Sequence, residues 1–157
     1  MTSSDLFAVN ELASRIHPAF PEDAAVFAER LRLYPAGCHV LERGQGVEAY
    51  VISHPWLRAD PPLLNSMLGE LPPAPSTFYI HDLALAPGVR GSGAAADIVG
   101  QLAEHAQMEG FSNMSLIAVN GSAGFWQRQG FEALPTPDLA HKLHSYGEDV
   151  LFMVRKL

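Results

Sequence analysis

The segment from residue 77 to residue 109 limits the fold of this chain more than any other part of the sequence. Residues 77–85 (TFYIHDLAL) are apolar on both faces, as is typical of a central strand of a sheet. A glycine-bearing turn follows, and residues 91–109 have the pattern of a helix that ends at Gly110. A strand, a turn and a helix in this order predict an α/β domain.

The rest of the sequence predicts further helices and strands around this unit. Helices are expected over about 4–16, 21–34 and 122–129, with a short amphipathic helix at Leu63–Leu68 and a helical turn at 138–146. Strands are expected at 38–42, 47–53, 115–119, 131–134 and 149–155. This order indicates a mixed (α+β) sheet flanked by helices. With 157 residues, we expect one domain over 1–157.

Charge and cysteine content exclude several classes of function. Ten Lys and Arg against 17 Asp and Glu leave a net charge of −7, which disfavours nucleic acid and anionic membrane surfaces and favours a cationic substrate. The single cysteine excludes an internal disulfide and a cysteine-based metal site, and no metal is expected. We see no signal peptide and no apolar run that could span a membrane, so a cytoplasmic location is expected.

The turn between Arg90 and Ala95 has the chemistry of a phosphate site. The first N–H groups of a helix lack partners, and together with the helix dipole they attract anions. Gly91 and Gly93 let a diphosphate approach the backbone, and Arg90 adds a cation at the rim. A P-loop is excluded because no Gly-Lys-Ser/Thr run exists. A dinucleotide-binding turn fits poorly, because Ala96 stands where its third glycine would be.

Two segments instead resemble the GCN5-related N-acetyltransferase (GNAT) family. Arg90, Gly93 and Ala95 match its acetyl-CoA motif, R/Q-x-x-G-x-G/A, after a strand end (LALAP, 83–87) similar to L-x-V-x-P. Residues 120–131 (NGSAGFWQRQGF) are similar to N-x-x-A-x-x-F-Y-x-x-x-G-F, one residue shorter. With the tail 143–153, the resemblance covers about residues 38–157.

The resemblance implies the GNAT-like acyl-CoA N-acyltransferase fold, in which two central parallel strands splay apart and acetyl-CoA enters the gap between them. The amide-bearing arm of the coenzyme would pair with the exposed backbone. The residues implied to bind it are Leu83, Leu85, Arg90, Gly91, Ser92, Gly93, Ala94, Ala95, Asn120 and Phe125. We expect the family's first strand to be missing or vestigial, because the first helix starts near Asp5. The sheet would then begin at the hairpin 38–53 with an exposed edge.

The implied reaction is attack on the thioester by an amine of a small molecule or a peptide, which requires a base. His81 stands where several family members carry a glutamate base; a buried structural histidine is the alternative. Regular alternation along the strand places two sets of side chains on opposite faces. These sets are Tyr79, His81, Leu83 and Leu85, and Phe78, Ile80, Asp82 and Ala84.

One residue departs from the family pattern. Trp126 occupies the position of the tyrosine that commonly serves as general acid, and an indole N–H cannot release a proton at physiological pH. Tyr146 is the expected substitute, with Ser122 behind it; a packing role for Tyr146, or departure of the thiolate without an acid, is the alternative. Because of Trp126, a catalytically weak or inactive acyl-CoA-binding module stays open as a second function. The glycine turn alone leaves an NAD(P)-binding oxidoreductase open as a third.

The acceptor is not identified by any motif. We expect the loop Pro18–Pro21 and residues 55–76 to surround it, and a homodimer is compatible with the sequence. The other histidines have no carboxylate at a ligand spacing and are interpreted as structural or surface residues: His17, His39, His54, His105, His141 and His144.

Overall fold

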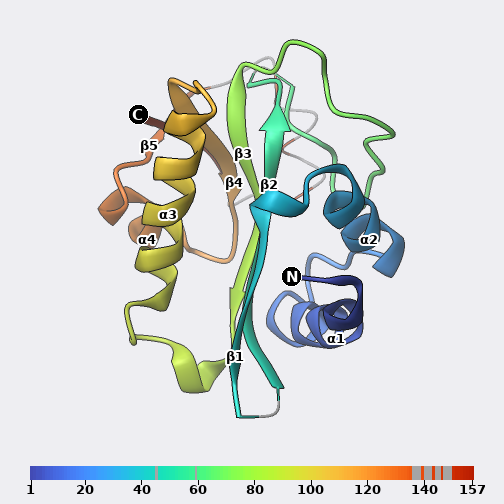
Figure 1. Ribbon diagram of the computed structural model, residues 1–157. Helices are drawn as coiled ribbons and strands as arrows, with labels where there is room; N and C mark the ends of the chain where they lie inside the picture. Colours follow the sequence, from blue (N-terminus) through green and yellow to red (C-terminus); the bar gives the residue numbers. More distant parts are fainter. Residues whose placement is uncertain (45, 59, 136–138, 140–142, 144–145, 147–149) are drawn as a thin grey trace.

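A computed structural model shows a six-stranded mixed sheet between two layers of helices (Figure 1). It describes all residues except 45, 59, 136–138, 140–142, 144–145 and 147–149. The strands are β1 (Cys38–Arg43), β2 (Gly46–Trp56), β3 (Thr77–Leu85), β4 (Asn113–Ala118), β5 (Glu132–Ala133) and β6 (Leu151–Lys156). They lie in the order β1-β2-β3-β4-β6-β5, and β3 and β4 are parallel neighbours at the centre.

Helices cover both faces of this sheet (Figure 1). The helices α1 (Leu6–Ile16) and α2 (Ala24–Leu33) pack on one face, and α3 (Ala94–Met108) and α4 (Ala123–Arg128) on the other. Short 3-10 helices occur at η1 (Ser3–Asp5), η2 (Pro35–Gly37) and η3 (Pro87–Val89). This arrangement confirms the expected fold class. None of the helices that the structure describes is long and apolar enough to cross a lipid bilayer.

The start of the sheet is as expected, but the proline-rich stretch is not. Residues 1–37, all described, form helices and no strand, and β1 is an edge strand. The helix predicted at Leu63–Leu68 is wrong, since the described part of 57–76 is irregular. Strand β2 also continues through Pro55 to Trp56. Proline is tolerated there because β2 has no outer neighbour beyond Ile52, so no ladder hydrogen bond is lost. The turn predicted at 138–146 falls mostly outside the described residues.

The central strands β3 and β4 diverge along their length. They pair only at Phe78 with Met114, Tyr79 with Ser115 and Ile80 with Leu116. Beyond these pairs β3 stays bonded to β2, and β4 stays bonded to β6, but not to each other. The facing edges of β3 and β4 therefore carry backbone N–H and C=O groups that a ligand can pair with.

A β-bulge occurs at the point where the two strands separate. Ile52 pairs with Asp82 and Ser53 with Ile80, so His81 is an extra residue in β3. Such a bulge turns two consecutive side chains toward the same face. The expected alternation beyond Ile80 is therefore wrong. Asp82 and Ala84 share the α1–α2 face with His81 and Tyr79, whereas Leu83 and Leu85 face α3.

A buried ion pair ties the loop 57–76 to α2. The Nη1 atom of Arg30 lies 2.6 Å from Oε2 of Glu29. Glu29 also accepts hydrogen bonds from the backbone N–H groups of Leu68 and Gly69, at 2.7 and 2.9 Å. Arg30 is completely buried and donates from Nη2 to the carbonyl of Ser66 at 2.7 Å. The loop is therefore held in place by α2.

We expect Arg30→Met to lower the free energy of unfolding by about 3–5 kcal/mol, because Glu29 would keep a buried charge without its partner. Urea denaturation followed by circular dichroism measures this loss. Arg15→Met, the same change at an exposed position of α1, serves as control and should stay within about 0.5 kcal/mol of the parent. Equal losses in the two variants would show that the ion pair does not hold the loop.

Candidate active site

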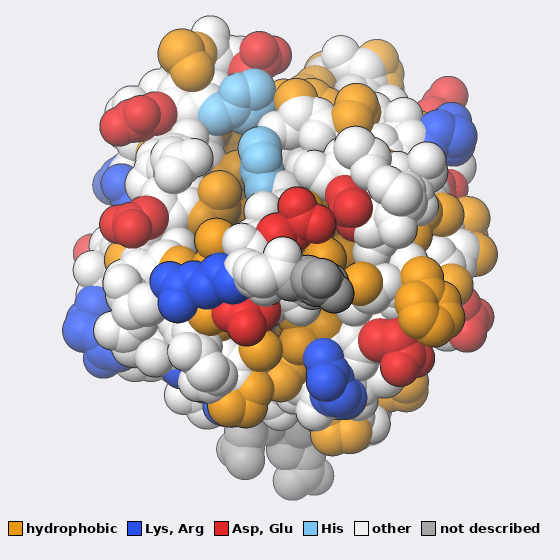
Figure 2. All heavy atoms as spheres, turned by 60° about the horizontal axis from the view of Figure 1, so that its bottom comes forward, with side chains coloured by type: hydrophobic (Ala, Val, Ile, Leu, Met, Phe, Trp, Pro, Cys, Tyr) orange, Lys and Arg blue, Asp and Glu red, His pale blue; other side chains and the backbone are white. Residues whose placement is uncertain are grey.

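The diverging edges of β3 and β4 open into a groove of about 790 Å³. One end lies at the N-terminus of α3, and the other end lies between the α1–α2 connection and the loop 57–76. Figure 2 shows the end of the molecule that is at the bottom of Figure 1, where β3 leads into η3. On this face the basic side chains lie apart from one another, among acidic and hydrophobic ones. An anion bound here therefore depends mainly on backbone groups.

The turn before α3 has the backbone geometry that an anion site needs. Gly91 and Gly93 both have left-handed φ angles, 77° and 91°, and Gly93 is the N-cap residue of α3. The predicted residues that line the groove at this end are Arg90, Gly91, Gly93, Ala94 and Ala95. The predicted residue Ser92 is not among the lining residues, and its hydroxyl donates to the carbonyl of Val89 at 2.8 Å.

Two arginines border this end of the groove. Arg90 is exposed, and its Nε donates to the carbonyl of Leu85 at 3.3 Å. Arg128, on α4, also lines the groove and was missed by the sequence analysis. Its spacing gave a usable signal, since Arg128 follows Phe125 by three residues and so lies on the same side of the helix.

The middle of the groove is bordered by Asn120, Phe125 and Trp126. Asn120 has a left-handed φ of 53°, and its Nδ2 lies 3.1 Å from Nδ1 of His17, across the groove. The rings of Phe125 and Trp126 pack edge to face with centroids 4.9 Å apart. Trp126 also packs on Phe131 at 5.4 Å and belongs to the core under α3. Leu83 and Leu85 line the facing wall.

The end of the groove between the α1–α2 connection and the loop 57–76 holds a buried carboxylate–imidazole pair. The Nε2 atom of His81 lies 2.9 Å from Oε2 of Glu22, and both side chains are less than a tenth exposed. The other oxygen of Glu22 accepts the backbone N–H of Asn65 at 3.1 Å. Burial alone would raise the pKa of Glu22, but the charge and hydrogen bond of His81 outweigh it and lower the pKa. Among the residues that the structure describes, none forms a hydrogen bond with the Nδ1 atom of His81.

Sequence analysis missed the role of Glu22 because its partner is on another element. Glu22 was assigned only to the first turn of a helix, and it lies just before α2 in the structure. The pair forms because the α1–α2 connection folds over the bulge in β3, a contact that no local pattern indicates.

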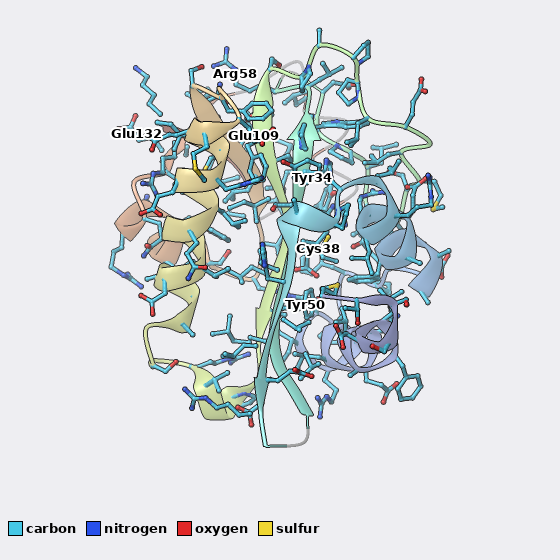
Figure 3. The ribbon with its side chains drawn as sticks, in the orientation of Figure 1. Tyr34, Cys38, Tyr50, Arg58, Glu109 and Glu132 are labelled. Carbon is cyan, nitrogen blue, oxygen red and sulfur yellow. The ribbon has the colours of Figure 1, made fainter. Side chains whose placement is uncertain are left out.

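A second pair lies beside the first. The Nε2 atom of His17 is 3.2 Å from Oδ1 of Asp82, at an angle that is poor for a hydrogen bond. The hydroxyl of Tyr50 donates to the other oxygen of Asp82, reaching from β2 toward α1 (Figure 3). Burial works to lower the pKa of His17, but the contact with Asp82 outweighs it and raises the pKa. The interpretation of His17 as a residue without a carboxylate partner is therefore wrong.

The structure also describes Tyr146 and three more of the histidines. Tyr146 lines the same end of the groove as Glu22 and His81, and its hydroxyl donates to the carbonyl of Pro62 at 3.0 Å. Burial raises the pKa of Tyr146, so its hydroxyl keeps its proton at neutral pH. Three other histidines contact structural groups: His39 the carbonyl of Ala36, His54 the carbonyl of Pro55, and His105 the hydroxyl of Tyr34 (Figure 3). His141 and His144 lie outside the described residues. Among the described residues, no group of three or more His, Cys, Asp or Glu could hold a metal ion.

The pair of His17 and Asp82 gives a testable titration. We expect the imidazole of His17 to titrate above about 6.5 by NMR. The stability that the pair adds is then present below that pH and is lost as the pH rises through the raised pKa. In Asp82→Asn the charge that opposes the effect of burial is removed, so the titration of His17 should move to lower pH. His39, whose partner is a carbonyl, is the internal control and should not move. A titration of His17 that Asp82→Asn leaves unchanged would contradict this assignment.

Comparison with known proteins finds one matching family. The family described as the acetyltransferase (GNAT) family matches residues 6–131. No curated protein matches the sequence.

Several solved structures are similar over nearly the whole chain. Ard1 from Thermoplasma volcanium has a TM-score of 0.75 at 13% identity, covering 100% of this chain and 94% of that one. The ribosomal-protein-S18-alanine N-acetyltransferase from Escherichia coli has a TM-score of 0.65 at 18% identity, covering 99% and 90%. The GphF GNAT-like decarboxylase, in complex with isobutyryl-CoA, has a TM-score of 0.73 at 17% identity, covering 99% and 96%. At these identities the likeness shows the fold, and this fold carries more than one kind of acyl-CoA chemistry.

Proposed function

The chain belongs to the acetyltransferase (GNAT) family, and on that premise we propose that it transfers the acetyl group of acetyl-CoA to a primary amine. Membership supports acyl-CoA N-acyltransferase activity in general. The observation that carries the proposal is the groove between β3 and β4. It joins an anion-binding turn at one end to a buried carboxylate–imidazole pair at the other.

Backbone groups supply most of the proposed contacts with the donor. The N-terminus of α3, with Gly91 and Gly93 before it, would hold the diphosphate of coenzyme A, with Arg90 and Arg128 as nearby cations. The free edges of β3 and β4 would pair with the amides of the pantetheine arm. In this arrangement a backbone N–H near Leu83 polarises the thioester carbonyl and stabilises the oxyanion.

His81 is the proposed general base, with Glu22 holding it. The acceptor arrives as an ammonium ion and loses a proton to the imidazole, directly or through a water molecule. The charge of Glu22, 2.9 Å away, stabilises the imidazolium that forms. The neutral amine then attacks the carbonyl carbon, so a C–N bond forms, the C–S bond breaks and the thiolate leaves.

Neither Trp126 nor Tyr146 is placed to give a proton to the leaving group, which supports one alternative. Trp126 packs in the core and cannot release a proton, and the hydroxyl of Tyr146 is bonded to Pro62. A thiol with a pKa of about 8.5 can leave as the thiolate without help. A catalytically weak or inactive acyl-CoA-binding module is therefore the second candidate. Release of free thiol from acetyl-CoA, measured with and without a panel of amines, distinguishes the two.

The donor site is tested at the N-cap of α3. In Gly93→Val, a side chain at a left-handed φ of 91° would strain the turn and block the approach of a diphosphate. We expect calorimetry to detect no binding of coenzyme A. Gly88→Val is the matched control, because Gly88 is exposed in η3, has open space around it and does not line the groove. If a folded Gly93→Val protein binds as well as the control, the turn is not the diphosphate site.

The base is tested by two substitutions at the acceptor end. We expect His81→Ala to lower kcat/KM by about 10²–10⁴-fold while the affinity for coenzyme A stays constant. Glu22→Gln keeps an acceptor for Asn65 but removes the charge, so its kcat/KM should fall in the same direction by a smaller factor. His39→Ala, a histidine outside the groove, is the control. Full activity in His81→Ala would transfer the role of base to another group.

A further inference from the structure

We propose that the acceptor is a hydrophobic monoamine: a primary amine with one positive charge on an apolar body. It is either a free molecule or the first residue of a peptide with an apolar side chain. This inference rests on the proposed function and names the acceptor class of the same site. It comes from two properties of the acceptor end, the pairing of its carboxylates and the chemistry of its walls.

Both acidic residues among the described lining residues are already paired. Glu22 contacts His81 through one oxygen and the N–H of Asn65 through the other. Asp82 contacts His17 through one oxygen and the hydroxyl of Tyr50 through the other. Among the described residues, every oxygen of the two carboxylates therefore already has one polar contact, and a second cation would have to share an oxygen with the group that holds it. A second ammonium group of a polyamine would lose its hydration and gain only a shared partner.

The first ammonium group does not meet the same difficulty. It loses its charge at the pair of Glu22 and His81, because deprotonation is the step that this pair is placed to perform. The net charge of −7 favours a cation in general, but it does not describe this part of the groove. The local pairing therefore selects acceptors with a single amine.

The walls next to these pairs are apolar. Ile16 precedes His17, Phe20 lies two residues before Glu22, and Leu64 precedes Asn65; all three line the groove. Leu64 is held in position because Asn65 accepts the N–H of Asp23 at 2.7 Å through its side chain. Burial of an apolar group against these side chains is favourable in free energy, whereas a second charge placed there has no favourable interaction with them. The body of the acceptor next to its amine is therefore apolar.

Hexylamine and 1,6-diaminohexane test the inference directly, since they differ only by the second amine. In a thiol-release assay with acetyl-CoA, we expect kcat/KM to be at least about tenfold higher for hexylamine. Short peptides that begin with Leu or Lys form a second matched pair, and the Leu peptide should be preferred. Comparing the Leu peptide with hexylamine then shows whether the source is a polypeptide or a free amine.

The outcomes separate this inference from the proposed function. A diamine or Lys peptide that reacts as well as its partner overturns the acceptor class but leaves acetyl transfer standing. No turnover with any amine overturns acetyl transfer itself, and the acceptor class with it.

A substitution in the wall provides an independent readout. Leu64→Asp places a carboxylate without a partner in the groove, so the ratio of diaminohexane to hexylamine activity should rise by about fivefold. Leu63→Asp is the matched control, because Leu63 is the adjacent residue, is 43% exposed and does not line the groove. Its ratio should equal that of the parent. Equal changes in both variants, or no change in Leu64→Asp, would overturn the placement of the acceptor body against Leu64.

Discussion

The extra residue in β3 at His81 is the constraint on which the site depends. Because it lies opposite Ile52 and Ser53, two consecutive side chains face the α1–α2 layer, where regular alternation would send one of them into the core under α3. These side chains are His81 and Asp82, and each meets a partner of opposite charge type from the connection between α1 and α2. Pairing between β3 and β4 also ends at the residue before the bulge. One backbone irregularity thus coincides with the opening of the groove and supplies its polar groups.

The parts of this site that could be predicted from the sequence are local in the chain. The turn at Arg90–Ala95 and the segment 120–131 both contribute residues that line the groove, and both could be found from neighbouring residues, glycines before a helix in the first case. The bulge could not be predicted, since it is defined by the register of β3 against β2. Glu22 and His17 were missed for the same reason: their partners become neighbours only when the α1–α2 connection folds over the sheet. A local pattern also predicted a helix within 57–76, where tertiary bonds to α2 hold an irregular loop instead.

Trp126 packs in the core and cannot serve as a proton donor to the proposed leaving group. Its ring fills the space between Phe125 and Phe131, so the helix α4 is anchored to the core by a residue that offers no proton. Tyr146 is bonded to a loop carbonyl, and burial raises its pKa, which makes it a poor acid. The two carboxylate–imidazole pairs of the groove, in contrast, both lie at the end beside the α1–α2 connection. Such a distribution suits a reaction in which deprotonation of the amine, rather than protonation of the thiolate, needs assistance.

The loop 57–76 contacts both the proposed acceptor site and the group that holds the proposed base. Through the backbone N–H of Asn65 it orients Glu22, and through Leu64 it forms part of the apolar wall. The buried pair of Glu29 and Arg30 in α2 holds the same loop through hydrogen bonds to the backbone of Ser66, Leu68 and Gly69. A shift of the loop would therefore move the wall and the carboxylate together. A displacement of about 1 Å is enough to weaken a catalytic contact severely. The ion pair of Glu29 and Arg30 lies outside the groove, but by fixing the loop it keeps the wall and Glu22 in position.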